Sequence, residues 1–333
     1  MKIIIPMAGM GKRMRPQTLT TPKPLIPVAG KPIVQHLVED IVKVCGEPVT
    51  EIAYVVGHFG EQVEQQLLDI AAHEGAKGTI CYQEEALGTA HAVLCAREAL
   101  SGKVVVAFAD TLFRANFSLD TSADGIIWVH HVEDPRAFGV VTTDEQGIIS
   151  GFVEKPQSFV SDQAIIGIYY FRDGETLQQE LQYLIDHNIR KGVEYQLTDA
   201  LENMRQKGTR FFTGAVDEWL DCGNKEATLH TNLRLLETRQ QAGKQPASLK
   251  RSNSLVVEPC QIGENVVLTN AVVGPHVSIG DNTVIENSVV EDAIIREHVV
   301  IKNMILSNSI IGSHAVLEGS SRKVNLSDYS ELL

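Results

Sequence analysis

The first two thirds of the chain alternate short apolar runs with longer stretches in which apolar residues recur every three or four positions. Short apolar runs predict buried strands, and the three- and four-residue spacing predicts helices with one buried face. We expect strands at residues 2–6, 51–56, 104–109, 126–131 and 164–171. We expect helices at residues 32–44, 61–72, 89–100 and 225–241, and a hairpin that joins 140–142 to 148–153 through a turn at 144–147. This alternation predicts a mostly parallel sheet with helices on its faces.

The pattern changes in the last third of the chain, where apolar positions repeat with a period near 16 from Ile262 onward. Three columns align: Ile279 with Ile295 and Ile311, Val284 with Val300 and Val316, and Ile285 with Ile301 and Leu317. Such a repeat predicts a parallel β-helix of about four turns stacked on a shared apolar column. We therefore expect a first domain at residues 1–241, a linker at 242–254 and the β-helix at 255–333. Because a bare stack leaves a sheet edge unpaired, we expect it to pack against the first domain or a neighbouring copy.

Length and composition fit a globular protein with two buried cores, since 333 residues are 44% hydrophobic. Five scattered cysteines without a C-x-x-C spacing argue against both a disulfide framework and a zinc site. No apolar stretch approaches bilayer length, so we expect a cytoplasmic protein that does not bind membranes. The net charge of −13 repels nucleic acid. A phosphate ligand should therefore be small and held by local cations, aided by a divalent metal.

Two local motifs carry candidate chemistry. Residues 8–13 read Ala-Gly-Met-Gly-Lys-Arg directly after the first strand, where glycines let backbone amides approach phosphate oxygens. The loop fits neither a Walker loop nor a Rossmann G-x-G-x-x-G, since Met14 replaces the third glycine, and many such loops are only tight turns. Asp110 follows the apolar run 104–109, so it lies at the carboxyl end of a strand, where open α/β sheets bind ligands. A helix cap is the alternative interpretation of Asp110.

Several segments occur in one order along the chain: AGMGKRMRPQTLTTPKPLIPVAGKPIVQH, YQEEALGTAHA, FADT, RAFGVV, VEKP and WLDCGN. Together with the β-helical tail, they resemble the sugar-nucleotide pyrophosphorylases, which are sugar-1-phosphate nucleotidyltransferases. The resemblance implies an α/β fold: a Rossmann-like, mostly parallel nucleotidyltransferase domain followed by a short left-handed parallel β-helix. It also implies a Mg²⁺-dependent reaction of a nucleoside triphosphate with a sugar 1-phosphate that releases pyrophosphate.

The resemblance assigns roles to individual residues. It implies Arg13 and Lys23 as catalytic cations on the triphosphate, Ala8, Gly9, Gly11, Gln83, Gly88 and Thr89 as nucleotide-binding, Gly139, Glu154 and Lys155 as sugar-phosphate-binding, and Asp110 and Asp221 as magnesium ligands. Cations suit phosphoryl-type transfer because it depends on alignment and charge neutralisation. Two carboxylates, with waters and phosphate oxygens, complete the octahedral shell of magnesium. The alternative is that these residues are surface charges, a strand-end amide and an exposed ion pair.

The choice of substrates stays open between branches of the family. The short glycine loop, with Lys12, resembles the uridylyl-transferring branch, whereas TPKPLIPVAGKPI and the β-helical tail resemble the long-form thymidylyltransferases. We expect dTTP or UTP with glucose 1-phosphate, and a homo-oligomer. A mannose-1-phosphate guanylyltransferase is one alternative.

Two alternatives change the class of protein. In a bifunctional enzyme the β-helix would add acyl transfer, but His298 and His314 share a column with Asn265 and Asn282, which indicates a turn position. A catalytically silent regulatory subunit would not need both Asp110 and Asp221.

Overall fold

The computed structural model describes all residues except 116–118, 191, 239–244 and 320–333, and it contains two compact units. The N-terminal unit comprises Met1–Ile26 and Pro32–Asn224, and the C-terminal unit comprises Pro27–Lys31 and Lys225–Leu333. The sequence places the end of the first domain at residue 241, whereas packing groups helix α6 (Lys225–Thr238) with the C-terminal unit. Among the described helices, none has the length and apolar character that a bilayer crossing requires.

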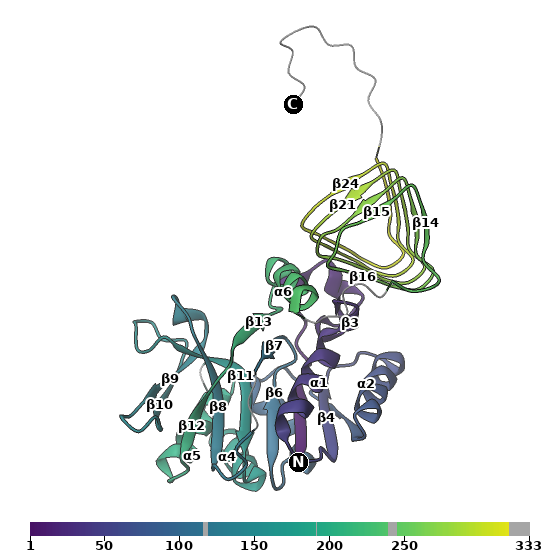
Figure 1. The fold of residues 1–333 in the computed structure, drawn as a ribbon. Coiled ribbons are helices and arrows are strands. Elements are labelled where there is room, and N and C mark those ends of the chain that lie inside the picture. The colour runs from purple at the N-terminus through teal and green to yellow at the C-terminus, as the bar shows by residue number, and fades with distance from the viewer. Residues whose placement is uncertain (116–118, 191, 239–244, 320–333) are drawn as a thin grey trace. The chain divides into compact units, whose positions relative to one another are not determined.

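Nine strands of the described chain form the sheet of the N-terminal unit (Figure 1). They are β1 (Lys2–Pro6), β4 (Glu51–Val56), β5 (Lys77–Tyr82), β6 (Val104–Ala107), β8 (Gly125–His131), β9 (Gly139–Thr143), β10 (Ile149–Glu154), β11 (Gln163–Phe171) and β12 (Phe211–Ala215). The order is β10-β9-β11-β6-β1-β4-β5, and β8 joins β11 to β12. The segment β6-β1-β4-β5 is parallel, and β11 pairs antiparallel with β6. The sheet and the hairpin predicted from the apolar runs are confirmed.

Helices pack against this sheet along their apolar faces. They are α1 (Ile33–Cys45), α2 (Glu61–His73), α3 (Thr89–Cys95), α4 (Gly174–Asp186) and α5 (Leu197–Gln206). In α1 the buried side chains of Ile33, Leu37 and Ile41 recur every four residues, and Gly46 ends the helix in the left-handed conformation. The predicted helix at 89–100 ends earlier, at Cys95, and continues as a short 3₁₀ turn. The predicted helices of this unit are otherwise confirmed, and α4 and α5 lie outside the sequence-based expectations.

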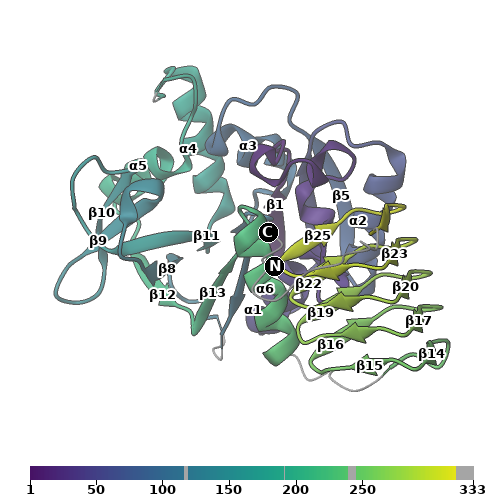
Figure 2. The ribbon, with the colours of Figure 1, turned by 90° about the horizontal axis from the view of Figure 1, so that it is seen from above.

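The C-terminal unit is a parallel β-helix, seen end-on in Figure 1 and from the side, with stacked turns, in Figure 2. One face contains β14 (Lys250–Ser252), β17 (Val267–Thr269), β20 (Val284–Glu286), β23 (Val300–Lys302) and β26 (Val316–Glu318). The second contains β15 (Leu255–Val256), β18 (Val272–Val273), β21 (Val289–Val290) and β24 (Ile305–Leu306). The third contains β16 (Cys260–Ile262), β19 (Val277–Ile279), β22 (Ala293–Ile295) and β25 (Ser309–Ile311).

The three predicted apolar columns pair in register, as Val284 with Val300 illustrates. The stack begins earlier than the repeat seen in the sequence, because β14 lies within the predicted linker and pairs with β17. The early turns are also one residue longer: Val273 pairs with Val256, 17 positions earlier, whereas Ile294 pairs with Ser278, 16 positions earlier. The extra residue sits at a proline-containing corner such as Gly274-Pro275. Residues 242–244 of the linker, 239–241 of the predicted helix and 320–333 of the predicted domain lie outside the described residues.

Corner residues of the β-helix adopt the left-handed backbone conformation. Asn265, Asn282, His298 and His314 form one such column, with φ between 56° and 60°. Asparagine is favoured there because its short polar side chain tolerates positive φ. The rings of His298 and His314 stack with their centroids 4.8 Å apart. The column is therefore a turn position, as its composition predicts.

A buried asparagine ties together the parts of the C-terminal unit. Asn232 of α6 is 1% exposed, and its amide oxygen accepts hydrogen bonds from the backbone N–H of Ala29 and the hydroxyl of Ser278, at 2.8 and 2.6 Å. Its amide nitrogen donates to the carbonyl of His276 at 3.2 Å. These bonds join three separate chain segments, which explains why α6 and residues 27–31 group with the β-helix.

Candidate functional site

The glycine loop begins where β1 ends, at the carboxyl edge of the parallel strands. Gly11 has φ +56°, and a Cβ there would lie 3.0 Å from side-chain carbons of both Thr18 and Lys23. The hydroxyl of Thr18 donates to the Gly11 carbonyl at 2.9 Å, which holds the loop closed. Gly11 is therefore needed both for its backbone conformation and for its close packing. A Cβ at Gly9 would meet no atom within 4 Å, so that side of the loop is open.

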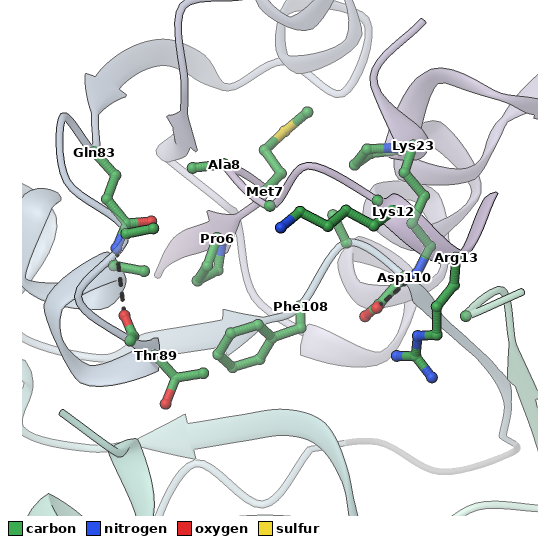
Figure 3. A pocket seen from close by; sticks show the side chains of 18 of the residues that line it. Pro6, Met7, Ala8, Lys12, Arg13, Lys23, Gln83, Thr89, Phe108 and Asp110 are labelled. Carbon is green, nitrogen blue, oxygen red and sulfur yellow. Dashed lines mark hydrogen bonds and ion pairs between the residues drawn. The ribbon is translucent and has the colours of Figure 1, made fainter. Parts of the chain in front are cut away.

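A cleft of about 400 Å³ opens beside this loop (Figure 3). It lies at the carboxyl ends of β1, β5 and β6. Its lining residues are Pro6, Met7, Ala8, Gly9, Gly11, Lys12, Arg13, Lys23, Pro24, Gln83, Ala86, Gly88, Thr89, Ala92, Phe108, Ala109, Asp110, Glu194 and Gly223. All residues predicted to contact the nucleotide line it, together with Arg13, Lys23 and Asp110. The lining also contains residues that the sequence does not single out, such as Met7, Phe108 and Glu194.

Lys23 and Asp110 form an ion pair in the wall of this cleft. The Lys23 ammonium lies 2.8 Å from a carboxylate oxygen of Asp110, although the two residues are 87 positions apart. Lys23 is only 8% exposed, whereas 43% of the Asp110 side chain is exposed. A buried ammonium requires a hydrogen-bonding partner, and Asp110 supplies it. The alternative interpretation of Lys23 as a surface charge is therefore wrong.

A two-stranded sheet places Asp221 beside Asp110. Strand β13 (Glu218–Asp221) pairs antiparallel with β7 (Thr111–Arg114), and Asp221 lies opposite Thr111. The backbone N–H of Cys222 donates to the carbonyl of Asp110 at 2.9 Å. Burial raises the pKa of Asp221, and the negative charge of Asp110 raises it further, against the opposing charges of Lys23 and Arg13. Two neighbouring carboxylates that repel one another form a site that a cation would stabilise.

The donor set fits magnesium better than a transition metal. Over the described part of the chain, no group of three or more His, Cys, Asp or Glu side chains is arranged to hold a metal. Magnesium commonly binds one or two carboxylates and takes its other ligands from water and substrate phosphates. Asp110 and Asp221 match that pattern.

Gln83, Gly88 and Thr89 form the opposite wall of the cleft. The amide nitrogen of Gln83 donates to the carbonyl of Gly88 at 3.3 Å, and it lies 3.2 Å from Nδ1 of His91. The sequence did not single out His91. Gly88 has φ +107°, and a Cβ there would lie 2.5 Å from the Tyr195 carbonyl oxygen. The hydroxyl of Thr89 accepts a hydrogen bond from the backbone N–H of Leu197 at 2.9 Å. Thr89 thus lines the cleft while it anchors the start of α5.

Gly139, Glu154 and Lys155 form a separate cluster on the β9–β10 hairpin and are not among the residues that line the cleft. Glu154 lies opposite Gly139, where an added Cβ would lie 3.0 Å from its carboxylate. Its other neighbours are the Thr198 hydroxyl, which donates to it at 3.2 Å, and the Lys155 ammonium at 3.6 Å. The Glu154 side chain is 15% exposed and that of Lys155 is 57% exposed, so a shielded carboxylate stands beside an accessible cation.

An aromatic pair lies between this cluster and the strand that carries Asp221. The rings of Phe138 and Trp219 meet edge to face, with their centroids 5.3 Å apart. Trp219 is two residues before Asp221, and Phe138 is next to Gly139. Among the described residues, the buried indole N–H of Trp219 has no acceptor. Sequence reasoning missed both rings, although Trp219 begins the WLDCGN motif.

Comparisons with known proteins give one consistent family. The family model described as "Nucleotidyl transferase" matches residues 2–238. The chain is 28% identical to the low-salt glycan biosynthesis nucleotidyltransferase Agl11 of Haloferax volcanii, and 29% identical to a glucose-1-phosphate thymidylyltransferase of Streptomyces antibioticus. Each alignment covers 89% of this chain and 87% of the relative. The mannose-1-phosphate guanylyltransferase catalytic subunit beta of Drosophila melanogaster is 31% identical over 84% of this chain and 71% of its own length.

A solved structure supports the fold. A UDP-glucose pyrophosphorylase complexed with UDP-glucose has a TM-score of 0.59 at 23% identity, over 72% of this chain and 99% of that chain. At 23% identity the structural similarity supports the fold but not the function. The match of the family model over most of the chain decides the classification: the protein belongs to the nucleotidyl transferase family.

Proposed function

We propose that the protein is a magnesium-dependent sugar-1-phosphate nucleotidyltransferase. The observation that carries the proposal is the cleft in which the glycine loop, Arg13, Lys23 and Asp110 meet, with Asp221 beside Asp110. Two of the relatives are named for transfer to a hexose 1-phosphate, which supports the same reaction class. A regulatory subunit without catalytic activity would have no use for a pair of mutually repelling carboxylates.

The reaction is a direct in-line displacement. A phosphate oxygen of the sugar 1-phosphate forms a bond to the α-phosphorus of the nucleotide, and the bond from that phosphorus to the bridging oxygen breaks. Pyrophosphate leaves with the bridging oxygen. Arg13 and Lys23 offset the negative charge that builds on the phosphates. The open side of the loop at Gly9 lets the phosphates approach the backbone closely. Magnesium bound by Asp110 and Asp221 would neutralise phosphate charge and orient the pyrophosphate.

Base selection follows from the amide of Gln83. Its nitrogen faces the Gly88 carbonyl, which leaves the amide oxygen as an acceptor for the base. Uracil and thymine offer a ring N–H at N3, whereas cytosine and adenine present a lone pair at the corresponding edge. We propose UTP or dTTP as the nucleotide. Guanine also carries a ring N–H at N1, so a mannose-1-phosphate guanylyltransferase satisfies the same contact.

Sugar binding is assigned to the hairpin cluster. The shielded carboxylate of Glu154 accepts hydrogen bonds from sugar hydroxyls, and the exposed ammonium of Lys155 binds the sugar phosphate. Gly139 is assigned to the same site because an added Cβ there would lie 3.0 Å from the Glu154 carboxylate and would displace it. Glucose 1-phosphate is the proposed sugar substrate.

The test is a substrate matrix read by pyrophosphate release. Five nucleoside triphosphates are combined with the 1-phosphates of glucose, mannose, galactose and N-acetylglucosamine, with Mg²⁺ present. We expect release only when both substrates are present, fastest with UTP or dTTP and glucose 1-phosphate. The Asp110→Asn variant is the control, and it should abolish release. If no pair releases pyrophosphate in the wild-type protein, the proposal is wrong.

A further inference from the structure

We infer that His91 is a positioning residue that, together with the Gly88 carbonyl, holds the direction of the Gln83 amide and thereby selects nucleobases that carry a ring N–H. This inference rests on the proposed function, since it concerns the nucleotide that the cleft accepts. His91 lies on α3, three residues after Gly88; its ring contacts the Gln83 amide, and it is not among the residues that line the cleft.

Two acceptors meet the same nitrogen of Gln83. The carbonyl oxygen of Gly88 lies 3.3 Å from Nε2, and Nδ1 of His91 lies 3.2 Å from it (Figure 3 draws the first contact). A carbonyl can only accept, so the contact with Gly88 favours the direction in which the amide nitrogen faces it. The NH₂ group has two hydrogens, one for each acceptor. His91 therefore adds a second constraint in the same direction.

The chemical state of His91 fits an acceptor. The half-buried ring has a pKa below the ordinary histidine value, because burial disfavours its charged form more than the nearby Glu85 carboxylate favours it. A neutral imidazole has one donor nitrogen and one acceptor nitrogen. The ring also hydrogen-bonds the backbone of Glu85. Donation to that backbone uses one nitrogen, and Nδ1 remains as the acceptor for Gln83.

A reversed amide would be opposed at two points. Its oxygen would face the carbonyl oxygen of Gly88 and the lone pair of His91 Nδ1, and neither can donate. In the observed direction the amide oxygen of Gln83 accepts no hydrogen bond from the described residues, so it is available to a base N–H. Uracil and cytosine are matched probes of this contact, because their rings are similar in size and differ at N3 and its neighbouring carbon.

Three forms of the full-length chain test the role of His91: wild type, His91→Leu and His91→Asn. Leucine fills a similar volume without an acceptor, and the side-chain oxygen of asparagine occupies nearly the place of Nδ1. Steady-state kcat and KM are measured for UTP and CTP with saturating glucose 1-phosphate and Mg²⁺. Thermal melting shows whether each variant folds. If His91→Leu does not fold, His91→Met is used instead, because the methionine side chain is flexible and lacks a strong acceptor.

We expect the ratio of kcat/KM for UTP over CTP to fall about two- to tenfold in His91→Leu, the size of one hydrogen-bonded contact. The loss should appear in the KM for UTP, with kcat and the KM for glucose 1-phosphate retained, and His91→Asn should keep the wild-type ratio. An unchanged ratio in His91→Leu, or an equal fall in both variants, would overturn the inference. A wild-type protein that joins no nucleotide to a sugar phosphate would instead refute the proposed function.

Discussion

Replacement of Lys23 by methionine separates a catalytic role from a structural one. Methionine keeps an unbranched stem, which preserves the close packing of the Lys23 Cβ beside Gly11. It removes the ammonium that lies 2.8 Å from Asp110. Because 43% of the Asp110 side chain is exposed, water can solvate the carboxylate that loses its partner. We therefore expect the free energy of unfolding to fall by no more than about 1 kcal/mol.

The effect on the reaction should be much larger. Lys23 is almost completely buried in the cleft wall, so the positive charge acts at low dielectric and solvent cannot replace it. The loss of one preorganised electrostatic contact lowers kcat by about 10²–10³, or about 2.7–4 kcal/mol of transition-state stabilisation.

The assay is pyrophosphate release at saturating substrates, with urea unfolding of the same preparations. Lys43→Met, which removes an exposed lysine of α1, is the matched control and should keep the wild-type rate. A Lys23→Met variant with near wild-type kcat would refute the assigned role. A loss of activity that follows the loss of folded protein would make Lys23 structural.

Three further variants test other parts of the site. The pKa of Asp221 is raised in the folded protein, so the folded protein binds the proton more tightly than the unfolded chain does. The ionised carboxylate therefore destabilises the fold at neutral pH, and this cost disappears below the ordinary pKa of 3.8, where the group is protonated in both states. Asp221→Asn should therefore have a higher melting temperature than wild type at pH 7 and lose that advantage as the pH falls below about 4. The variant should also be inactive. Equal melting temperatures at pH 7 would contradict the reasoning. Gly88→Ala should cost about 1–3 kcal/mol in urea unfolding and raise the KM for the nucleotide, because its φ is +107° and its Cβ would meet the Tyr195 carbonyl. Glu154→Gln should raise the KM for the sugar phosphate while the KM for the nucleotide is retained, and kinetics that change for the nucleotide alone would argue against a sugar role.

Much of the fold could be predicted because the spacing of apolar residues along the chain follows which face of each helix or strand is buried. The run Ile3-Ile4-Ile5 is completely buried in β1, and the columns of the β-helix repeat with the spacing of its turns. Strand β5 escaped prediction because it is an edge strand with no fully buried residue. Helix α4 carried a usable signal in Leu177, Leu181 and Leu184, which follow helical spacing.

The site was predictable only in part, because its contacts join distant positions. The sequence predicts that Asp110 lies at the end of a strand, because an apolar run precedes it. Its ion pair with Lys23 could not be predicted, because the fold brings together two residues 87 positions apart. Asp221 reaches Asp110 through the pairing of β7 and β13, two four-residue strands too short to show a period. The contact of His91 with Gln83 depends on where α3 begins relative to β5. Roles for Asp221, Glu154 and the glycines come from resemblance and stay predictions.

Isotope exchange tests most directly whether the protein transfers the nucleotidyl group straight to a sugar 1-phosphate. Radiolabelled pyrophosphate is incubated with the protein, Mg²⁺ and UTP or dTTP, with and without glucose 1-phosphate. We predict that label enters the nucleoside triphosphate only when the sugar phosphate is present, because the displacement has no intermediate on the enzyme. Label that enters without sugar phosphate would contradict direct displacement. No exchange with any sugar phosphate and nucleotide would contradict nucleotidyl transfer itself.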